Sequence, residues 1–122
     1  HDTTCANPNS RRRVSLFFLE RADTPEKAQR GLQNRHSLAV DHGMLFVPVQ
    51  PRNMIMWMKD TFIPLDMIFF NASGRIVYIH QNAQPMDQSL ISAYQPVAGV
   101  IEINAGLCQR LGISEGDQVL GY

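Results

Sequence analysis

The segment from Asp66 to Phe70 constrains the fold most, because nearly all of its side chains are apolar. Successive side chains of a β-strand point to opposite faces of the sheet, so a strand of this composition needs cover on both faces. Short apolar runs indicate further strands at 14–19, 43–47, 53–59, 75–80, 97–103 and 118–122. We therefore expect an α+β fold: a small, mostly antiparallel, β-barrel-like sheet with helical cover.

Two short helices complete this expectation. Thr24 is a residue that caps helices, and Pro25 suits the first helical position. Gly31 can adopt the left-handed conformation that ends many helices, so the first helix should stop there. A second helix is expected to be capped by Asn104 and to end at Gly112.

The length of 122 residues suits one domain with a real hydrophobic core. We expect residues 14–122 to form this domain and the polar residues 1–13 to be a flexible N-terminal tether. Residues 81–96, which are polar and contain two prolines, are expected to form a long surface loop. The chain begins with His1 rather than methionine, which suggests that a leader or tag has been removed.

Charge and hydropathy exclude several classes of partner. Eleven basic residues balance eleven acidic ones, so no overall field attracts nucleic acid. The run Arg11-Arg12-Arg13 is interpreted as a solvated strand edge, with a phosphate or lipid patch as the alternative. No apolar run approaches the roughly 20 residues of a membrane span. We therefore expect neither a nucleic-acid partner nor a membrane span.

The two cysteines, Cys5 and Cys108, lie near opposite ends of the chain. In an oxidising compartment they would form a disulfide that closes a long loop. The alternative is a free thiol in the tether and a small buried thiol in a helix. Lipid attachment at Cys5 is a third possibility.

The candidate site lies in the run from Trp57 to Asp66, which places charged residues between two apolar segments. Such charges are costly unless they are paired, hydrated or used for function. Trp57 and Lys59 alternate with methionines, so both should lie on one face of the strand. Lys59 and Asp66 are expected to meet near the barrel mouth. The predicted ligand-binding residues are Arg30, Arg35, Trp57, Lys59, Thr61 and Asp66.

Other interpretations of these residues stay open. Arg30, Lys59, Asp66 and Glu102 can form a purely structural ion network. In a cell-envelope enzyme, Asp66 would be a general base and Lys59 an electrostatic stabiliser. The methionines at 54, 56 and 58 would suit Cu(I), although such stripes are usually core residues. Phosphate-binding loops and nucleophile elbows are absent from the sequence, so catalytic residues stay unassigned and no cofactor is expected.

These motifs resemble those of the Domain of Unknown Function 192 family. Members carry an Arg-Gly-Leu motif, a Gly-Met-Leu-Phe strand, a Trp-Met-Lys-Asn-Thr-x-Ile-Pro-Leu-Asp signature and a closing Leu-Gly-Ile-x-x-Gly-Asp turn. The corresponding residues here are 30–32, 43–46, 57–66 and 111–117, with further matches at Gly74-Arg75, Pro85 and around Glu102. The resemblance spans residues 14–122.

The chain departs from this family pattern at three positions. Gln33 and Asn34 replace a methionine and an aromatic residue, and Asp60 replaces an asparagine. The resemblance implies a compact barrel-like α+β domain, often exported in bacteria, and no assigned activity. We therefore expect a periplasmic or otherwise exported protein that binds a polar or anionic small ligand, or a partner's acidic group, without catalysing a reaction.

Overall fold

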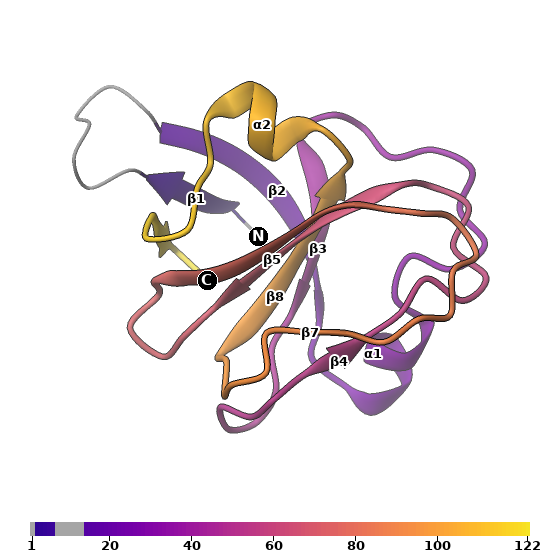
Figure 1. Ribbon diagram of the computed structural model, residues 1–122, viewed down its shortest axis with the longest axis horizontal. Helices are drawn as coiled ribbons and strands as arrows, with labels where there is room; N and C mark the ends of the chain where they lie inside the picture. Colours follow the sequence, from indigo (N-terminus) through magenta and orange to yellow (C-terminus); the bar gives the residue numbers. More distant parts are fainter. Residues whose placement is uncertain (1, 7–13) are drawn as a thin grey trace.

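The structure is a computed structural model that describes residues 2–6 and 14–122 (Figure 1). It contains a large curled sheet, a two-stranded sheet and two short helices. The elements are β1 (Asp2–Ala6), β2 (Val14–Ala22), α1 (Pro25–Arg30), β3 (His42–Phe46), β4 (Ile55–Met56), β5 (Leu65–Phe70), β6 (Ile76–Ala83), β7 (Ile91–Ser92), β8 (Gly99–Asn104), α2 (Leu107–Leu111) and β9 (Gln118–Leu120).

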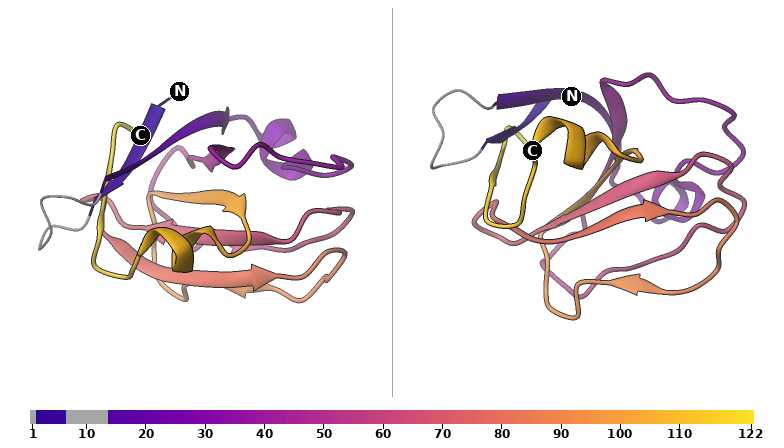
Figure 2. Two further views of the ribbon diagram at one scale, coloured as in Figure 1. Left: turned by 90° about the horizontal axis from the view of Figure 1, so that it is seen from above. Right: turned by 45° about the horizontal axis from the view of Figure 1, so that its top comes forward.

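The large sheet has the strand order β6-β5-β8-β3-β2-β1-β9. Only the β2–β3 pair is parallel among the described strand pairs of this sheet. The sheet curls until its edge strands meet at one end: Val119 N–H donates to the Gly74 carbonyl at 2.7 Å, and Ile76 N–H donates to the Asp117 carbonyl at 2.8 Å. The curl is visible in both views of Figure 2. The predicted α+β, barrel-like fold is therefore confirmed.

The two faces of the sheet pack into separate hydrophobic clusters. All six side chains of β5 are buried, as expected for a strand that needs cover on both faces. Met67 and Phe69 join one cluster with residues of the β4 and β7 segments. Ile68 and Phe70 join the other cluster, which includes Leu107 and Cys108 of α2. Figure 1 shows α1 and the β4–β7 pair well separated from α2.

The structure differs from the predicted tether at residues 2–6. They form β1, which pairs antiparallel with β2 and with β9. The side chains of this strand alternate in direction, and those of Thr3 and Cys5 point into the core. This mostly polar segment therefore still has one buried face. Residues 1 and 7–13 of the predicted tether lie outside the described residues.

Three local predictions, on two segments and one helix cap, were wrong. The strand expected at 53–59 is reduced to Ile55–Met56, because the chain turns at 58–61. The expected loop 81–96 includes the end of β6 and the short strand β7, which pairs with β4. Asn104 does not cap α2: its side chain donates to the Leu38 carbonyl at 2.6 Å, and Gly106 occupies the N-cap position.

Cys5 and Cys108 both lie in the cluster beneath α2 and are free thiols in the structure. Burial raises the pKa of Cys5 to about 12, with a smaller effect of the Asp117 charge. Burial is also the main cause of a raised pKa at Cys108, followed by the nearby Asp66 carboxylate. The burial of Cys5 argues against lipid attachment there. A disulfide in an oxidising compartment stays a prediction.

Within the described ranges, no helix is long and apolar enough to cross a membrane.

Candidate functional site

Trp57 and Lys59 lie on the exposed side of the 53–59 segment, as the alternation predicted. The Trp57 side chain is 42% exposed. The Lys59 Nζ atom lies 5.3 Å from the centre of the Trp57 ring, within the range of a cation–π contact. Met54 and Met58 on the opposite side are buried. The indole and the ammonium therefore form a small exposed pair.

Asp66 is fully buried on the α2 face of the sheet. Its Oδ1 accepts the N–H of Asn82 at 2.9 Å, and its Oδ2 accepts the N–H groups of Gly106 and Cys108 at 3.1 and 3.0 Å. Two of these donors lie at the start of α2, where backbone N–H groups lack helical partners. Of the ion pairs found in residues 2–6 and 14–122, none joins Lys59 to Asp66. Asp66 thus links α2 to the sheet.

The two predicted arginines have different surroundings. Arg35 forms an ion pair with Glu20, with an N–O distance of 2.6 Å. Arg30 is exposed at the end of α1, and the described part of the chain offers it no ion-pair partner. The expected network joining Arg30, Lys59, Asp66 and Glu102 is therefore not seen among these side chains.

Thr61 is buried in the tight turn that follows Lys59. Its hydroxyl donates to the Lys59 carbonyl at 3.1 Å, and its N–H donates to the Met58 carbonyl at 3.1 Å. Asp60 in this turn has a φ of 53°, in the left-handed region that asparagine and aspartate tolerate better than most residues. An aspartate at this position is therefore compatible with the turn.

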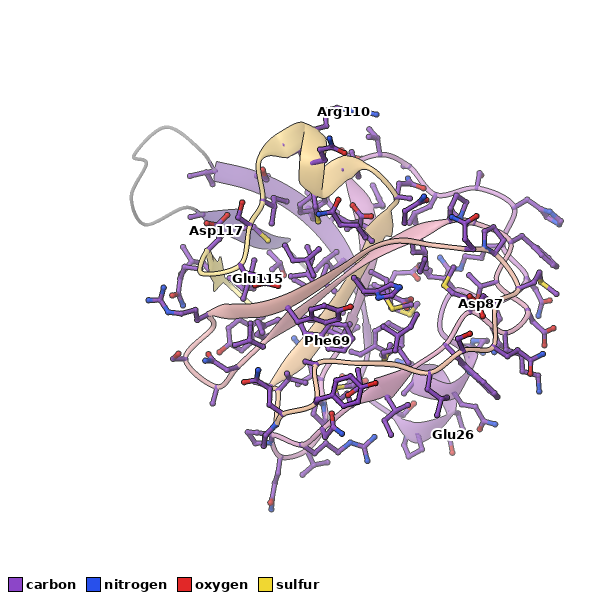
Figure 3. The ribbon with its side chains drawn as sticks, viewed as in Figure 1. Glu26, Phe69, Asp87, Arg110, Glu115 and Asp117 are labelled. Atoms are coloured by element: carbon purple, nitrogen blue, oxygen red, sulfur yellow. The ribbon has the colours of Figure 1, made fainter. Side chains whose placement is uncertain are left out.

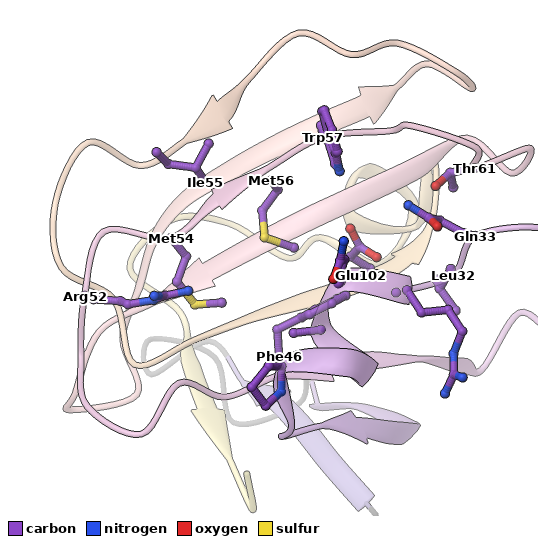
Figure 4. A pocket seen from close by; sticks show the side chains of 15 residues that line it. Leu32, Gln33, Phe46, Arg52, Met54, Ile55, Met56, Trp57, Thr61 and Glu102 are labelled. Carbon is purple, nitrogen blue, oxygen red and sulfur yellow. The ribbon is translucent and has the colours of Figure 1, made fainter.

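A pocket of about 340 Å³ opens beside this turn, between α1, the 52–57 segment and the large sheet (Figure 4). Arg30, Trp57 and Thr61 line it, whereas Arg35, Lys59 and Asp66 do not. Figure 4 shows Trp57 and Phe46 on opposite sides of Glu102. The volume lies within the usual range of small-molecule sites. The structure therefore brings together three of the six predicted site residues.

Glu102 of β8 forms the polar floor of this pocket. Its side chain is only 4% exposed, and it lies between Met44 of β3 and Met67 of β5 in the sheet register. In the described structure its carboxyl group has no ion pair and no hydrogen-bond partner. Burial raises the pKa of Glu102 to about 8 from its ordinary value of 4.5. At pH 7 the group is therefore mostly neutral.

Glu102 was absent from the predicted ligand-binding set. The signal that points to it is an isolated acid in the apolar run 100–103, a pattern that also fits a solvent-facing or paired side chain. Only the strand pairing shows that this acid lies beside two methionines and opens into a pocket.

The methionines around Glu102 serve mainly as core. Met44 and Met67 are buried beside it, and Met54 and Met56 line the pocket (Figure 4). Across the described side chains, no group of three or more histidine, cysteine, aspartate or glutamate residues is arranged to hold a metal ion. The copper interpretation stays a prediction.

Two motif glycines shape the site. A Cβ atom at Gly43 would clash with the Glu102 carbonyl oxygen, so glycine permits β3 and β8 to approach closely there. Gly31 ends α1 with a φ of 50°, and a Cβ atom there would lie 3.4 Å from the Phe46 ring. Both glycines therefore place the chain against residues that line the pocket.

The comparisons with known proteins agree with this fold. The family model DUF192, described as an uncharacterised ACR, matches residues 6–121. A crystal structure from Sinorhizobium meliloti 1021, described as a "putative transcription regulator", has 40% sequence identity and a TM-score of 0.94, with 98% of this chain and 92% of that chain covered. A protein of unknown function from Novosphingobium aromaticivorans DSM 12444 has 36% identity and a TM-score of 0.92, covering 98% of this chain and 84% of that one. A comparison with curated proteins finds no match. The chain belongs to the DUF192 family.

Proposed function

We propose that the protein binds a small anionic or polar organic ligand in the pocket above Glu102. The proposal rests on the buried Glu102 carboxyl group. This group faces a cavity, and it has no hydrogen-bond or ion-pair partner among the described residues. Buried polar groups are nearly always hydrogen-bonded, so an unpaired one at the floor of a cavity is a candidate for ligand contact.

The charges that line the pocket favour an anion. Arg30 and Arg52 are its two charged basic residues, and Glu102 is its one acidic residue. Because the raised pKa keeps Glu102 mostly neutral at pH 7, the lining carries a net positive charge. The neutral carboxyl group can donate a hydrogen bond to a ligand oxygen, while the guanidinium groups attract its negative charge.

The pocket walls favour an organic ligand over a simple inorganic ion. Trp57, Met56 and Phe46 provide apolar and aromatic surface around the polar floor. This combination of apolar walls with a few polar groups is typical of small-molecule sites. The proposed site keeps Arg30 and Trp57 from the sequence-based set, with Thr61 at its edge, and adds Glu102 and Arg52.

A small ligand fits the chain better than nucleic acid. The Sinorhizobium meliloti structure is described as a putative transcription regulator. In this chain, however, eleven basic residues are balanced by eleven acidic ones, and the pocket is too small for a duplex.

We also propose a periplasmic or otherwise exported location, which the family resemblance supports. Fractionation of cells producing the full-length protein would test this location.

The experiment is a calorimetric screen of small organic acids at pH 7. Arg52→Ala and Arg30→Ala should each weaken binding roughly ten- to a hundredfold, since each removes a charge-assisted contact. Arg110→Ala is the matched control. Arg110 is an exposed arginine on α2, and Figure 3 shows it far from Glu26 of α1, the helix that borders the pocket. Equal losses in all three variants would indicate non-specific attraction and contradict the proposal.

The pH dependence tests the role of Glu102. Between about pH 6, where an organic acid is fully ionised, and about pH 8 the affinity should be nearly constant, and it should fall as Glu102 ionises above this range. Glu102→Gln, which mimics the neutral acid, should retain binding and remove this fall. If Glu102→Gln instead abolishes binding, or if amines bind better than acids, the ligand is cationic and the proposal is wrong.

Acid–base catalysis by Glu102 is the second candidate function. A pKa of about 8 in a pocket is suitable for proton transfer near neutral pH. Asp66, the base suggested by the sequence, is fully buried and already accepts three backbone hydrogen bonds. Glu102→Gln separates the two functions, because it should preserve ligand binding but abolish turnover.

A further inference from the structure

A second hollow, of about 560 Å³, adjoins the pocket above Glu102. It lies between the start of α1 and the loop that follows β3. Nine of its thirteen lining residues are apolar, including Val47, Pro48, Val49 and Pro51 of this loop. Val49 is fully exposed although it is apolar. Because the prolines at 48 and 51 restrict the backbone, this apolar surface is held open toward solvent.

The two cavities share part of their lining. Phe46, Arg52 and Met54 line both of them, as do Pro25 and Ala28 of α1. Figure 4 shows Arg52 and Met54 at one end of the first pocket and Thr61 with Gln33 at the other. The second hollow therefore continues the pocket at its Arg52 end, away from Thr61.

The polarity changes along this path. The first pocket contains Glu102, Thr61 and Gln33, and Arg52 stands where the two cavities meet. In the second hollow, the Asp23 carboxylate lies within 4 Å of Arg21 and Lys27, and the Thr24 hydroxyl accepts the Lys27 N–H. Of the four polar side chains that line this hollow, only Gln50 and Arg52 are thus left to satisfy the amides of a peptide. An aliphatic chain, which needs no such partners, suits the hollow better.

We propose that the ligand is an elongated amphiphile with one acidic head and one aliphatic chain. The head occupies the pocket above Glu102, and the chain runs past Arg52 and Met54 into the hollow beside Val49. This inference rests on the proposed function, because it places the head in that same pocket. The chain would cover Val49.

The experiment compares linear carboxylates of four, six, eight and ten carbons by calorimetry at pH 7, below their micelle concentrations. Each added methylene that enters the hollow should strengthen binding about fourfold, as expected for burial of a methylene group. Decylamine, which has the same chain length but a positive head, should bind at least about tenfold more weakly than decanoate.

Val49→Asp tests the hollow directly, and its full exposure means that the variant should fold normally. It should weaken decanoate binding about tenfold or more and leave butanoate binding unchanged. Val40→Asp is the matched control, because Val40 is also exposed but lines neither cavity.

The outcomes separate the two proposals. Acids that bind equally at all chain lengths, or that lose equal affinity in Val49→Asp and Val40→Asp, would overturn the elongated ligand and leave the proposed function standing. The proposed function fails as well if the acids bind but the variants have no effect. In that outcome Arg30→Ala and Arg52→Ala leave the affinity unchanged, and Glu102→Gln leaves its pH dependence unchanged.

Discussion

Two buried carboxyl groups on neighbouring strands have opposite environments. Asp66 of β5 faces α2 and accepts three backbone N–H groups. Glu102 of β8 faces α1 and the β4–β7 pair, and within the described structure it accepts no hydrogen bond and forms no ion pair. In the sheet register Glu102 lies opposite Met67, the residue next to Asp66, so the two acids point to opposite faces.

This difference separates stability from function. A buried carboxylate that accepts three backbone N–H groups from two separate segments holds the fold together, and removing it leaves those donors unpaired. Burial of Glu102 without an ion pair among the described residues disfavours its ionised form, while its oxygens remain accessible from the pocket rather than sealed in the core. We infer that the α2 face of the sheet is structural and that the α1 face carries the ligand site.

The largest predicted effect is at Asp66. Asp66→Ala should lower the free energy of unfolding by about 5 kcal/mol, since three charge-assisted hydrogen bonds are lost. Urea denaturation measures this loss. Asp87→Ala is the matched control, because Asp87 is exposed and its hydrogen bonds are local, to Ser89 two residues later, with the backbone N–H at 2.8 Å; its loss should cost under about 1 kcal/mol. Similar losses in the two variants would contradict the structural role of Asp66.

The next effect is the pH dependence of stability at Glu102. Its pKa rises from 4.5 to about 8 on folding, so between these values the folded state holds a proton that the unfolded state has released. Stability should therefore fall with rising pH, by about 2.5 kcal/mol between pH 5 and pH 7 relative to Glu102→Gln. Urea denaturation of both proteins at the two pH values tests this. Parallel pH profiles would show that Glu102 is not buried as described.

A smaller effect is expected at Gly43, where β3 passes closest to β8. A Cβ atom there would clash with the Glu102 carbonyl oxygen and lie 2.9 Å from Ile103 Cγ2. Gly43→Ala should therefore cost about 2 kcal/mol, the usual range for overpacking. The same variant should weaken organic-acid binding, because it displaces the strand that carries Glu102. An unchanged affinity, measured by calorimetry on the folded variant, would place the site elsewhere.

The smallest effect is expected at Lys59. Its ammonium group contacts the Trp57 ring at the exposed surface, an arrangement that contributes about 0.5–1 kcal/mol. Lys59→Ala should lower the free energy of unfolding by no more than this and leave acid binding nearly unchanged, since Lys59 does not line the pocket. A large loss of affinity would restore Lys59 to the site that the sequence suggested.

The sequence was most informative where structure depends on local pattern. The period-two alternation around Trp57 and Lys59 and the all-buried strand at 65–70 were predictable, because each depends on neighbouring residues. Thr24 caps α1 as predicted, through a bond to the Lys27 N–H at 3.2 Å.

The candidate site was less predictable because its contacts join distant parts of the chain. The partners of Asp66 lie 16, 40 and 42 residues later, so its capping of α2 has no local signal. Glu102 reaches the pocket only because β8 pairs with both β3 and β5. Arg52 lines both cavities, and its position is fixed by backbone bonds to Val97.

The most direct test of this account is the pKa of Glu102, measured by carbon-13 NMR of the glutamate carboxyl groups, with Glu102→Gln used to assign the signal. We predict a titration midpoint near 8. Addition of a bound organic acid should raise the midpoint further, because a nearby negative charge disfavours ionisation. A midpoint near the ordinary value of 4.5, unchanged by any acid, would contradict it.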